Sequence, residues 1–223
     1  MEKIDHRISY FMVLDTETAN TLDDALVYDL GYAIIDKRGK VYETASFVNT
    51  DIFLDMKDIM ESAYYAEKIP NYYKDLWDGT RTPSTTLGIR RAIYNACEKW
   101  NVKAISAHNA RFDHRAVNTT IRYITKSKLR YFLPYGIPIF DTLKMARSVI
   151  LKMPTYSAFC EEYGYYTANG QKKATAEILY RFISGNVEFI ESHTGLEDVM
   201  IEKEIFAYCY RQKKSMKKLL YEN

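Results

Sequence analysis

Short apolar runs dominate the first fifty residues of the chain. The continuous run at residues 10–14 predicts a strand that is buried on both faces, because no polar side chain interrupts it. A second apolar segment spans 25–35, and a polar turn at 36–40 separates it from a third at 41–48. Connections this short indicate a β-meander of three strands.

Helical periodicity begins further along the chain. Residues 86–100 place apolar side chains near one face, which predicts an amphipathic helix. Asp141 precedes another such segment and is placed to cap it. Further helices are expected over residues 112–124, 142–151, 154–163 and 174–183 and from residue 195 onward, and further strands over 102–107 and 137–140. Strands followed by strand–helix alternation predict an α/β fold, a mixed sheet with helices on its faces.

Residues 51–80 are rich in tyrosine, and we expect them to be partly helical and interrupted at Pro70. The 223 residues have the length of one domain, so we expect a single domain over 1–223 with a Tyr-rich insertion at 51–80 and a basic tail at 211–223. For the tyrosines of residues 64–73, packing over the sheet is the simpler expectation, and stacking on single-stranded bases is the alternative.

Composition excludes several classes of protein. Hydrophobic residues make up 47% and charged residues 27% of the chain, which is typical of a globular domain and excludes a disordered one. The longest apolar run, at 205–210, is far shorter than the ~18 residues of a membrane span. The N-terminus lacks the hydrophobic segment of a secretory signal, and three scattered cysteines fit a reducing compartment. We therefore expect a cytoplasmic protein without membrane contact.

The formal net charge of +2 argues against a wholly basic, histone-like binder of nucleic acid, but the total hides two basic stretches. Residues 115–130 carry five Arg and Lys side chains and no acid, and residues 211–218 carry five more. A solvated surface and contact with a polyanion backbone both explain such stretches, and charge alone does not distinguish them.

Two carboxylates follow the first predicted strand. Side chains two residues apart lie on the same face of a strand, so Asp15 and Glu17 should project side by side where the strand leaves the sheet. Functional sites of α/β sheets are usually built at strand ends. Adjacent carboxylates repel each other unless a cation lies between them, and hard divalent ions prefer oxygen ligands. The pair therefore indicates a metal site, with two solvated loop acids as the simpler alternative.

Two further segments carry polar groups to the starts of helices. At residues 108–113 a predicted strand gives way to a helix, which Asn109 can cap and whose first turn contains Asp113. At the last helix, Thr194 and Glu197 have the spacing of a capping box, with His193 just before the helix and Asp198 in its first turn. These groups can converge on Asp15 and Glu17 at one end of the sheet.

The three segments together resemble the motifs of the DEDDh exonucleases of the ribonuclease-H-like superfamily, which include the proofreading subunit of the bacterial replicative polymerase, ribonuclease T and oligoribonuclease. The family's Asp-x-Glu matches Asp15 and Glu17, its His-Asn-x-x-Phe-Asp matches residues 108–113, and its His-x4-Asp matches His193 and Asp198. The resemblance covers roughly residues 8–210 and implies a ribonuclease-H-like sheet with three antiparallel strands followed by parallel strands.

The resemblance also implies the chemistry of the site. Asp15, Glu17, Asp113 and Asp198 are implied to bind two divalent cations, Mg²⁺ or Mn²⁺, with Asp15 between both ions. His193 is implied to be the general base that takes a proton from the attacking water. The implied activity is release of 5′-mononucleotides from the 3′ end of nucleic acid. The implied nucleic-acid contacts are Thr18, Asn109 and Phe112 to the terminal nucleotide, and Arg115, in the basic stretch, to upstream phosphates.

The substrate expected is a single-stranded 3′ end, with DNA favoured. An exoribonuclease with the same residues is the alternative, because recognition of the 2′-OH depends on the shape of the pocket. A non-catalytic polymerase-accessory subunit is a third interpretation, disfavoured because all five site residues are present. Ala19 and Asn20 stand where the family usually has Thr-Gly, and residues 51–80 exceed the matching segment of polymerase proofreaders. The chain is in this respect more similar to stand-alone phage exonucleases, for which a host cytoplasm is expected. A polymerase or other replication protein is a further expected partner.

Overall fold

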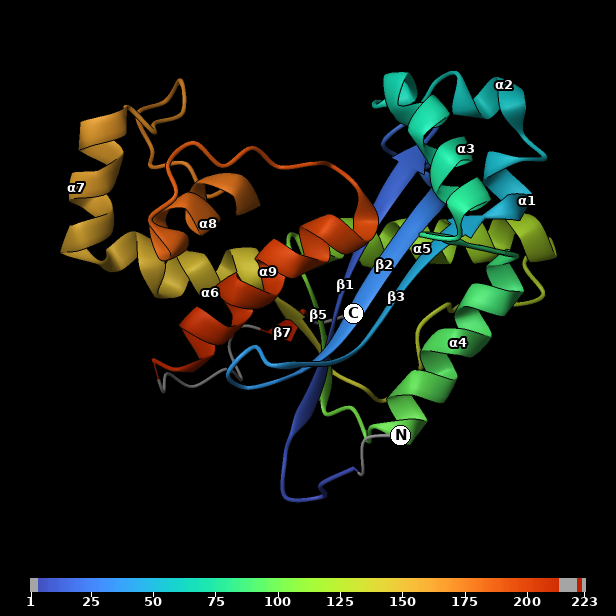
Figure 1. Ribbon diagram of the computed structural model, residues 1–223, viewed down its shortest axis with the longest axis horizontal. Coiled ribbons are helices and arrows are strands. Elements are labelled where there is room, and N and C mark those ends of the chain that lie inside the picture. Colours follow the sequence, from blue (N-terminus) through green and yellow to red (C-terminus); the bar gives the residue numbers. More distant parts are fainter. Residues whose placement is uncertain (1–3, 213–219, 222–223) are drawn as a thin grey trace.

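A seven-stranded mixed sheet forms the centre of the computed structural model, which describes residues 4–212 and 220–221 (Figure 1). The strand order across the sheet is β4-β3-β2-β1-β5-β6-β7. The strands are β1 Tyr10–Ala19, β2 Leu26–Asp36, β3 Val41–Asn49, β4 Thr82–Ser84, β5 Ala104–Ala107, β6 Ile139–Asp141 and β7 Leu220–Tyr221.

The arrangement of the strands confirms the predicted ribonuclease-H-like sheet. Strands β1, β2 and β3 form the antiparallel meander, and β5 and β6 continue it in parallel from β1. Two short edge strands were not predicted: β4 runs parallel to β3, and β7 runs antiparallel to β6. As its continuous apolar pattern predicts, β1 is buried on both faces along residues 10–14.

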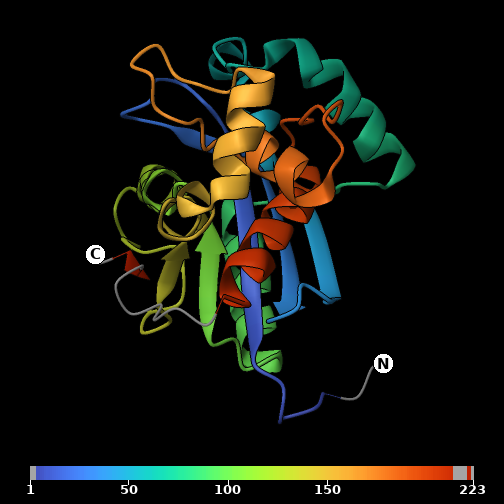
Figure 2. The ribbon, with the colours of Figure 1, turned by 90° about the vertical axis from the view of Figure 1, so that its left-hand side faces the viewer.

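Alternation along β1 divides the core into two layers. Met12 and Leu14 pack against α4 (Thr86–Lys99) and α5 (Ala110–Thr125) on one face of the sheet. Phe11 and Val13 face the opposite layer, which contains the C-terminal helices (Figure 2). The helical segments of that layer are α6 Thr142–Ser148, the 3-10 helix η2 Ile150–Lys152, α7 Pro154–Tyr163, α8 Ala176–Ser184 and α9 Gly195–Tyr210.

The Tyr-rich segment forms a small helical layer of its own beside the ends of β2 and β3 (Figure 1). It consists of α1 Thr50–Phe53, α2 Lys57–Met60, the 3-10 helix η1 Ala66–Lys68 and α3 Ile69–Asp78. The prediction that Pro70 interrupts a helix is wrong: Pro70 lies in the first turn of α3, where its missing N–H is no loss. Tyr72 is buried in this layer, whereas Tyr64 and Tyr73 are exposed.

The predicted cap of α6 is confirmed, because the Asp141 side chain accepts hydrogen bonds from the backbone amides of Leu143 and Lys144. The predicted capping box of α9 is wrong, although the helix does begin at Gly195. The Thr194 hydroxyl donates to the Glu197 carboxylate over 2.8 Å instead of accepting from the helix backbone. The same oxygen, Glu197 Oε2, also forms an ion pair of 2.8 Å with Arg81.

Helix α9 crosses β2 at a pair of glycines. A Cβ atom at Gly31 would lie 2.3 Å from the backbone nitrogen of Leu196, and one at Gly195 would lie 2.7 Å from the backbone nitrogen of Gly31. The Gly195 amide also donates to the buried Asp29 carboxylate over 2.9 Å. This close approach fixes the first turn of α9 over the sheet.

Most of the predicted basic tail at 211–223 lies outside the described residues. Cys97, Cys160 and Cys209 are all buried and free of disulfides. None of the helices in the described part of the chain is long and apolar enough to cross a membrane.

Gly31→Ala should destabilise the protein, because the new methyl group would meet backbone atoms that cannot rotate away. We expect urea denaturation to show a loss of ~1–3 kcal/mol or more in the free energy of unfolding. Gly88→Ala is the matched control, since its Cβ would meet the rotatable Ser84 hydroxyl. Equal stability of Gly31→Ala and wild type would contradict the close crossing.

Candidate active site

The end of β1 places two carboxylates beneath α9. Asp15 and Glu17 point to the face of the sheet that α9 covers, and ligand oxygens of Asp15, Glu17 and Asp198 lie within 4.8 Å of one another. The pairing of β1 with β2 shifts register between Glu17 and Thr18. A β-bulge of this kind re-aims side chains and is frequent next to active sites.

Asp113 enters the site from the first turn of α5. Its buried carboxylate accepts a 2.8 Å hydrogen bond from the hydroxyl of Thr16, which lies between the two carboxylates of β1 and points to the α5 face. Asn109 precedes the helix in the left-handed conformation, with φ of 63° and no side-chain cap. The backbone N–H of Asn109 donates to the Asp141 carboxylate over 3.2 Å, which ties the starts of α5 and α6 together.

Asp198 is held at the start of α9. It accepts hydrogen bonds from the Ser192 hydroxyl at 3.2 Å and from the Thr194 amide at 3.0 Å. These bonds orient the two oxygens of a carboxylate that is only 5% exposed. His193 lies in the same turn with φ of 50°, a left-handed conformation that is rare outside glycine and clusters at functional sites.

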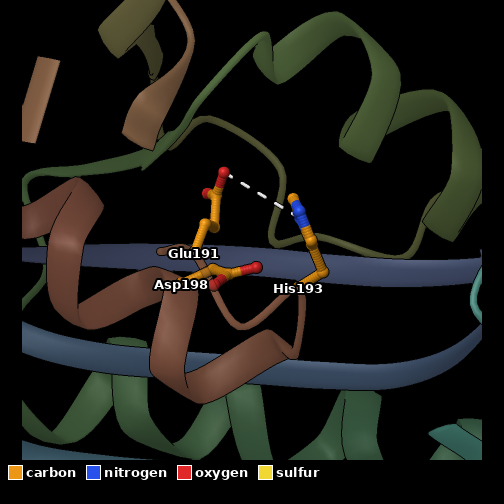
Figure 3. A group of neighbouring side chains, drawn as sticks. All are labelled: Glu191, His193 and Asp198. Atoms are coloured by element: carbon orange, nitrogen blue, oxygen red, sulfur yellow. Dashed lines mark ion pairs between the residues drawn. The ribbon is translucent and has the colours of Figure 1, made fainter. Parts of the chain in front are cut away.

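His193 is positioned by an aromatic ring stacked on its imidazole and by an acid near Nδ1. The Tyr65 ring stacks on it with centroids 4.6 Å apart and planes 12° from parallel. Glu191 Oε2 lies 3.9 Å from His193 Nδ1, a pair marked by the dashed line in Figure 3, and Asp198 lies below both residues in that view. Lys68 lies 4.2 Å over the Tyr65 ring and donates to the His193 carbonyl over 3.3 Å. The Tyr-rich segment thus holds the loop that carries His193.

All five predicted catalytic residues line one cavity of about 1060 Å³. Phe112 lines it as well, and the far wall comes from residues 166–176. Thr18, Asn109 and Arg115 are not among its lining residues. Arg115 instead donates to the Leu22 carbonyl over 2.8 Å at the protein surface.

Burial raises the pKa of every carboxyl group of the set. The pKa of Glu17 rises to about 8, with repulsion from Asp198 adding to burial. Burial likewise raises the pKa of Asp113 and of Asp198 to about 7, although hydrogen bonds to each partly offset the effect. The pKa of Asp15 lies well above its usual range because of burial and, next in size, the charge of Glu202.

Burial and the positive charge of Lys68 have the opposite effect on His193, whose pKa they lower. The imidazole is therefore neutral near pH 7 and able to accept a proton. His108, which matches the first position of the second motif, has both ring nitrogens engaged, with Thr142 at 3.0 Å and the Ala174 carbonyl at 3.0 Å. Its contacts indicate a role in holding β5 to the segment before α8.

The residues fit a divalent cation. Asp15, Glu17 and Asp198 supply hard oxygen ligands close enough to share one ion. A second group, formed by Glu191, His193 and Asp198, also has its ligand atoms within 4.8 Å of one another. Like charges buried this closely are unfavourable without a counter-charge, which a cation supplies.

Sequence reasoning missed Tyr65, Lys68, Glu191 and Glu202. Nothing in the sequence connects Lys68 with His193, which lies 125 residues further on. Glu202 could have been predicted from its spacing, because it follows Asp198 by four residues on one helix and so lies on the same helix face.

No protein-family model and no curated protein matches this chain. Solved structures do match it. Exonuclease I of E. coli in complex with a 5cy-dT13 oligonucleotide has a TM-score of 0.56 at 15% identity, over 90% of this chain and 42% of that one. S. pombe Pop2p in its Mg²⁺- and Mn²⁺-bound form has a TM-score of 0.55 at 13% identity, over 96% of this chain and 88% of that one.

At this level of identity the similarities establish the fold alone, which is ribonuclease-H-like. The chain spans less than half of the exonuclease I structure.

In the absence of divalent cations, the free energy of unfolding should fall as pH rises. The folded pKa values, about 8 for Glu17 and about 7 for Asp113 and Asp198, exceed the ~4 of an unfolded chain, so the folded protein binds more protons in this window. Glu202 adds to the repulsion among these acids. The positive charge of Lys68 acts in the opposite direction and lowers the pKa of Glu17.

Thermal unfolding in chelator should therefore show a Tm that falls between about pH 5 and pH 8.5, and Mn²⁺ should raise Tm more at the upper end. A Tm in chelator that rises with pH across this range would contradict the buried acid cluster.

Proposed function

We propose that this chain is a metal-dependent 3′–5′ exonuclease that removes 5′-mononucleotides from the 3′ ends of nucleic acid, with single-stranded DNA favoured. The observation that carries the proposal is the convergence of four carboxylates and one imidazole in a single cavity. The fold shared with exonucleases supports it. We further infer that residues 1–223 act as one exonuclease domain.

Four side chains would hold two divalent cations, Mg²⁺ or Mn²⁺. Asp15, Glu17 and Asp198 suit one ion because their oxygens lie within 4.8 Å, and Asp113 approaches from the α5 side. When bound, such ions lower the pKa of an attacking water and offset charge on the leaving oxygen. The Mg²⁺- and Mn²⁺-bound Pop2p structure supports these ions as cofactors.

His193 would act as the general base. Burial and Lys68 lower its pKa and keep the imidazole neutral near pH 7, so it can take a proton from water. Stacking on Tyr65 fixes the plane of the ring, and Glu191 lies beside Nδ1. A carboxylate next to Nδ1 stabilises the imidazolium that forms, which favours the transfer.

The cavity offers both kinds of contact that a single strand requires. Phe112 and Tyr166 provide rings for stacking on bases, and Arg147 and Lys172 provide positive charge for phosphates.

Thr18, Asn109 and Arg115 are proposed contacts to the strand outside the cavity. The oligonucleotide bound to exonuclease I supports a nucleic-acid substrate. A replication protein such as a polymerase is a proposed partner.

A time course on oligonucleotides with a 5′ label tests the proposal. We expect single-stranded DNA to give a ladder that shortens from the 3′ end with Mg²⁺ or Mn²⁺ and no products with chelator. RNA of the same sequence should be degraded more slowly. Internal cleavage, or cleavage in chelator, would rule out the proposed reaction.

Three variants make the assay specific. Asp15→Asn should abolish hydrolysis without a loss of Tm, because it removes a metal ligand and some repulsion. His193→Ala should reduce turnover by ~10²–10⁴ and leave Mn²⁺ binding intact. Asp24→Asn, at an exposed acid outside the cavity, is the matched control and should keep wild-type activity.

A further inference from the structure

Glu202 is a fifth carboxylate in the wall of the active-site cavity. It lies on α9 one turn after Asp198, and its side chain points into the same cavity. Only 3% of its surface is exposed to solvent. Acids this deeply buried are rare unless they are paired or bind a metal.

One oxygen of this carboxylate has no hydrogen-bond partner among the residues that the structure describes. The His108 backbone amide hydrogen-bonds to the side chain, but Glu202 Oε2 is buried and accepts no hydrogen bond from residues 4–212 or 220–221. Nearly all buried polar atoms in folded proteins are hydrogen-bonded, so an orphaned carboxylate oxygen that faces a cavity indicates a ligand that completes it.

The charges around Glu202 place it on one side of the site. After burial, the largest effects on its pKa come from Asp113 and Asp198, both of which raise it. In turn, Glu202 has the largest charge effect on Asp15. Lys68 acts on Glu17 and Asp198, whereas the main charges acting on Glu202 are all negative. Asp15, Asp113 and Glu202 therefore share one part of the cavity, and the largest charge effects on Glu202 all come from other acids.

We propose that Glu202 Oε2 is an additional metal ligand, which binds a divalent cation together with Asp15 and Asp113. The proposal rests on the proposed function, because it extends the same metal centre. Mg²⁺ sites of enzymes that act on phosphates usually take one or two carboxylates and leave other positions to water and substrate phosphate. A third carboxylate lets this ion bind before nucleic acid arrives.

Mn²⁺ titration into the full chain without nucleic acid tests this, with calorimetry at about pH 8 as the readout. Wild type should bind two ions. Glu202→Gln should bind one of them at least ~10-fold more weakly, since loss of even an indirect contact to a metal costs about 10–100-fold in affinity. Glu204→Gln, on the same helix but partly exposed and paired with Lys203, is the matched control and should bind like wild type.

The outcomes separate this inference from the proposed function. If wild type binds no Mn²⁺, the metal centre itself is wrong. If wild type and Glu202→Gln bind two ions with equal affinity, Glu202 is only a buried neutral acid and the additional ligand is refuted, while the proposed function stands. Circular dichroism checks folding, and Glu202→Met takes the place of Glu202→Gln if the latter does not fold.

Discussion

Asp29 is fully buried in β2 and accepts hydrogen bonds from the Tyr72 hydroxyl at 2.7 Å, the Gly195 amide at 2.9 Å and the Arg81 guanidinium at 3.2 Å. These donors come from α3, from the start of α9 and from the segment before β4. One carboxylate therefore joins the Tyr-rich layer to the sheet and to the helix that carries Asp198. Removing one partner of a buried ion pair is strongly destabilising, so the position of α9 depends on this contact.

Once α9 is fixed, the remaining acids are forced together. Asp198 and Glu202 descend from the helix toward β1, and Asp113 approaches from the opposite layer through Thr16. Burial and mutual repulsion raise the pKa values of these groups, so the fold maintains an arrangement that is unfavourable on its own. Divalent cations relieve that repulsion, which couples the stability of the fold to its proposed chemistry.

Much of this architecture could be predicted from the sequence, because the apolar run of β1 and the periodicity of the helices are local signals. The two-residue spacing of Asp15 and Glu17 also predicted that both side chains lie on the same face of β1. Residues such as Tyr65 could not be placed, since their contacts with His193 depend on tertiary packing between distant segments. The two-residue strand β7 and the three-residue strand β4 carry too few side chains for any pattern. The capping box of α9 does not form: the Thr194 hydroxyl donates to Glu197, and Arg81, which is remote in sequence, pairs with the same oxygen.

The proposed metal centre requires that carboxylates from β1, α5 and α9 converge on divalent cations. Anomalous diffraction from crystals soaked in Mn²⁺ tests it most directly. We expect anomalous density against Asp15, shared with Glu17 and Asp198 and extending toward Asp113. Density confined to surface acids, with these carboxylates bound only to water, would contradict it.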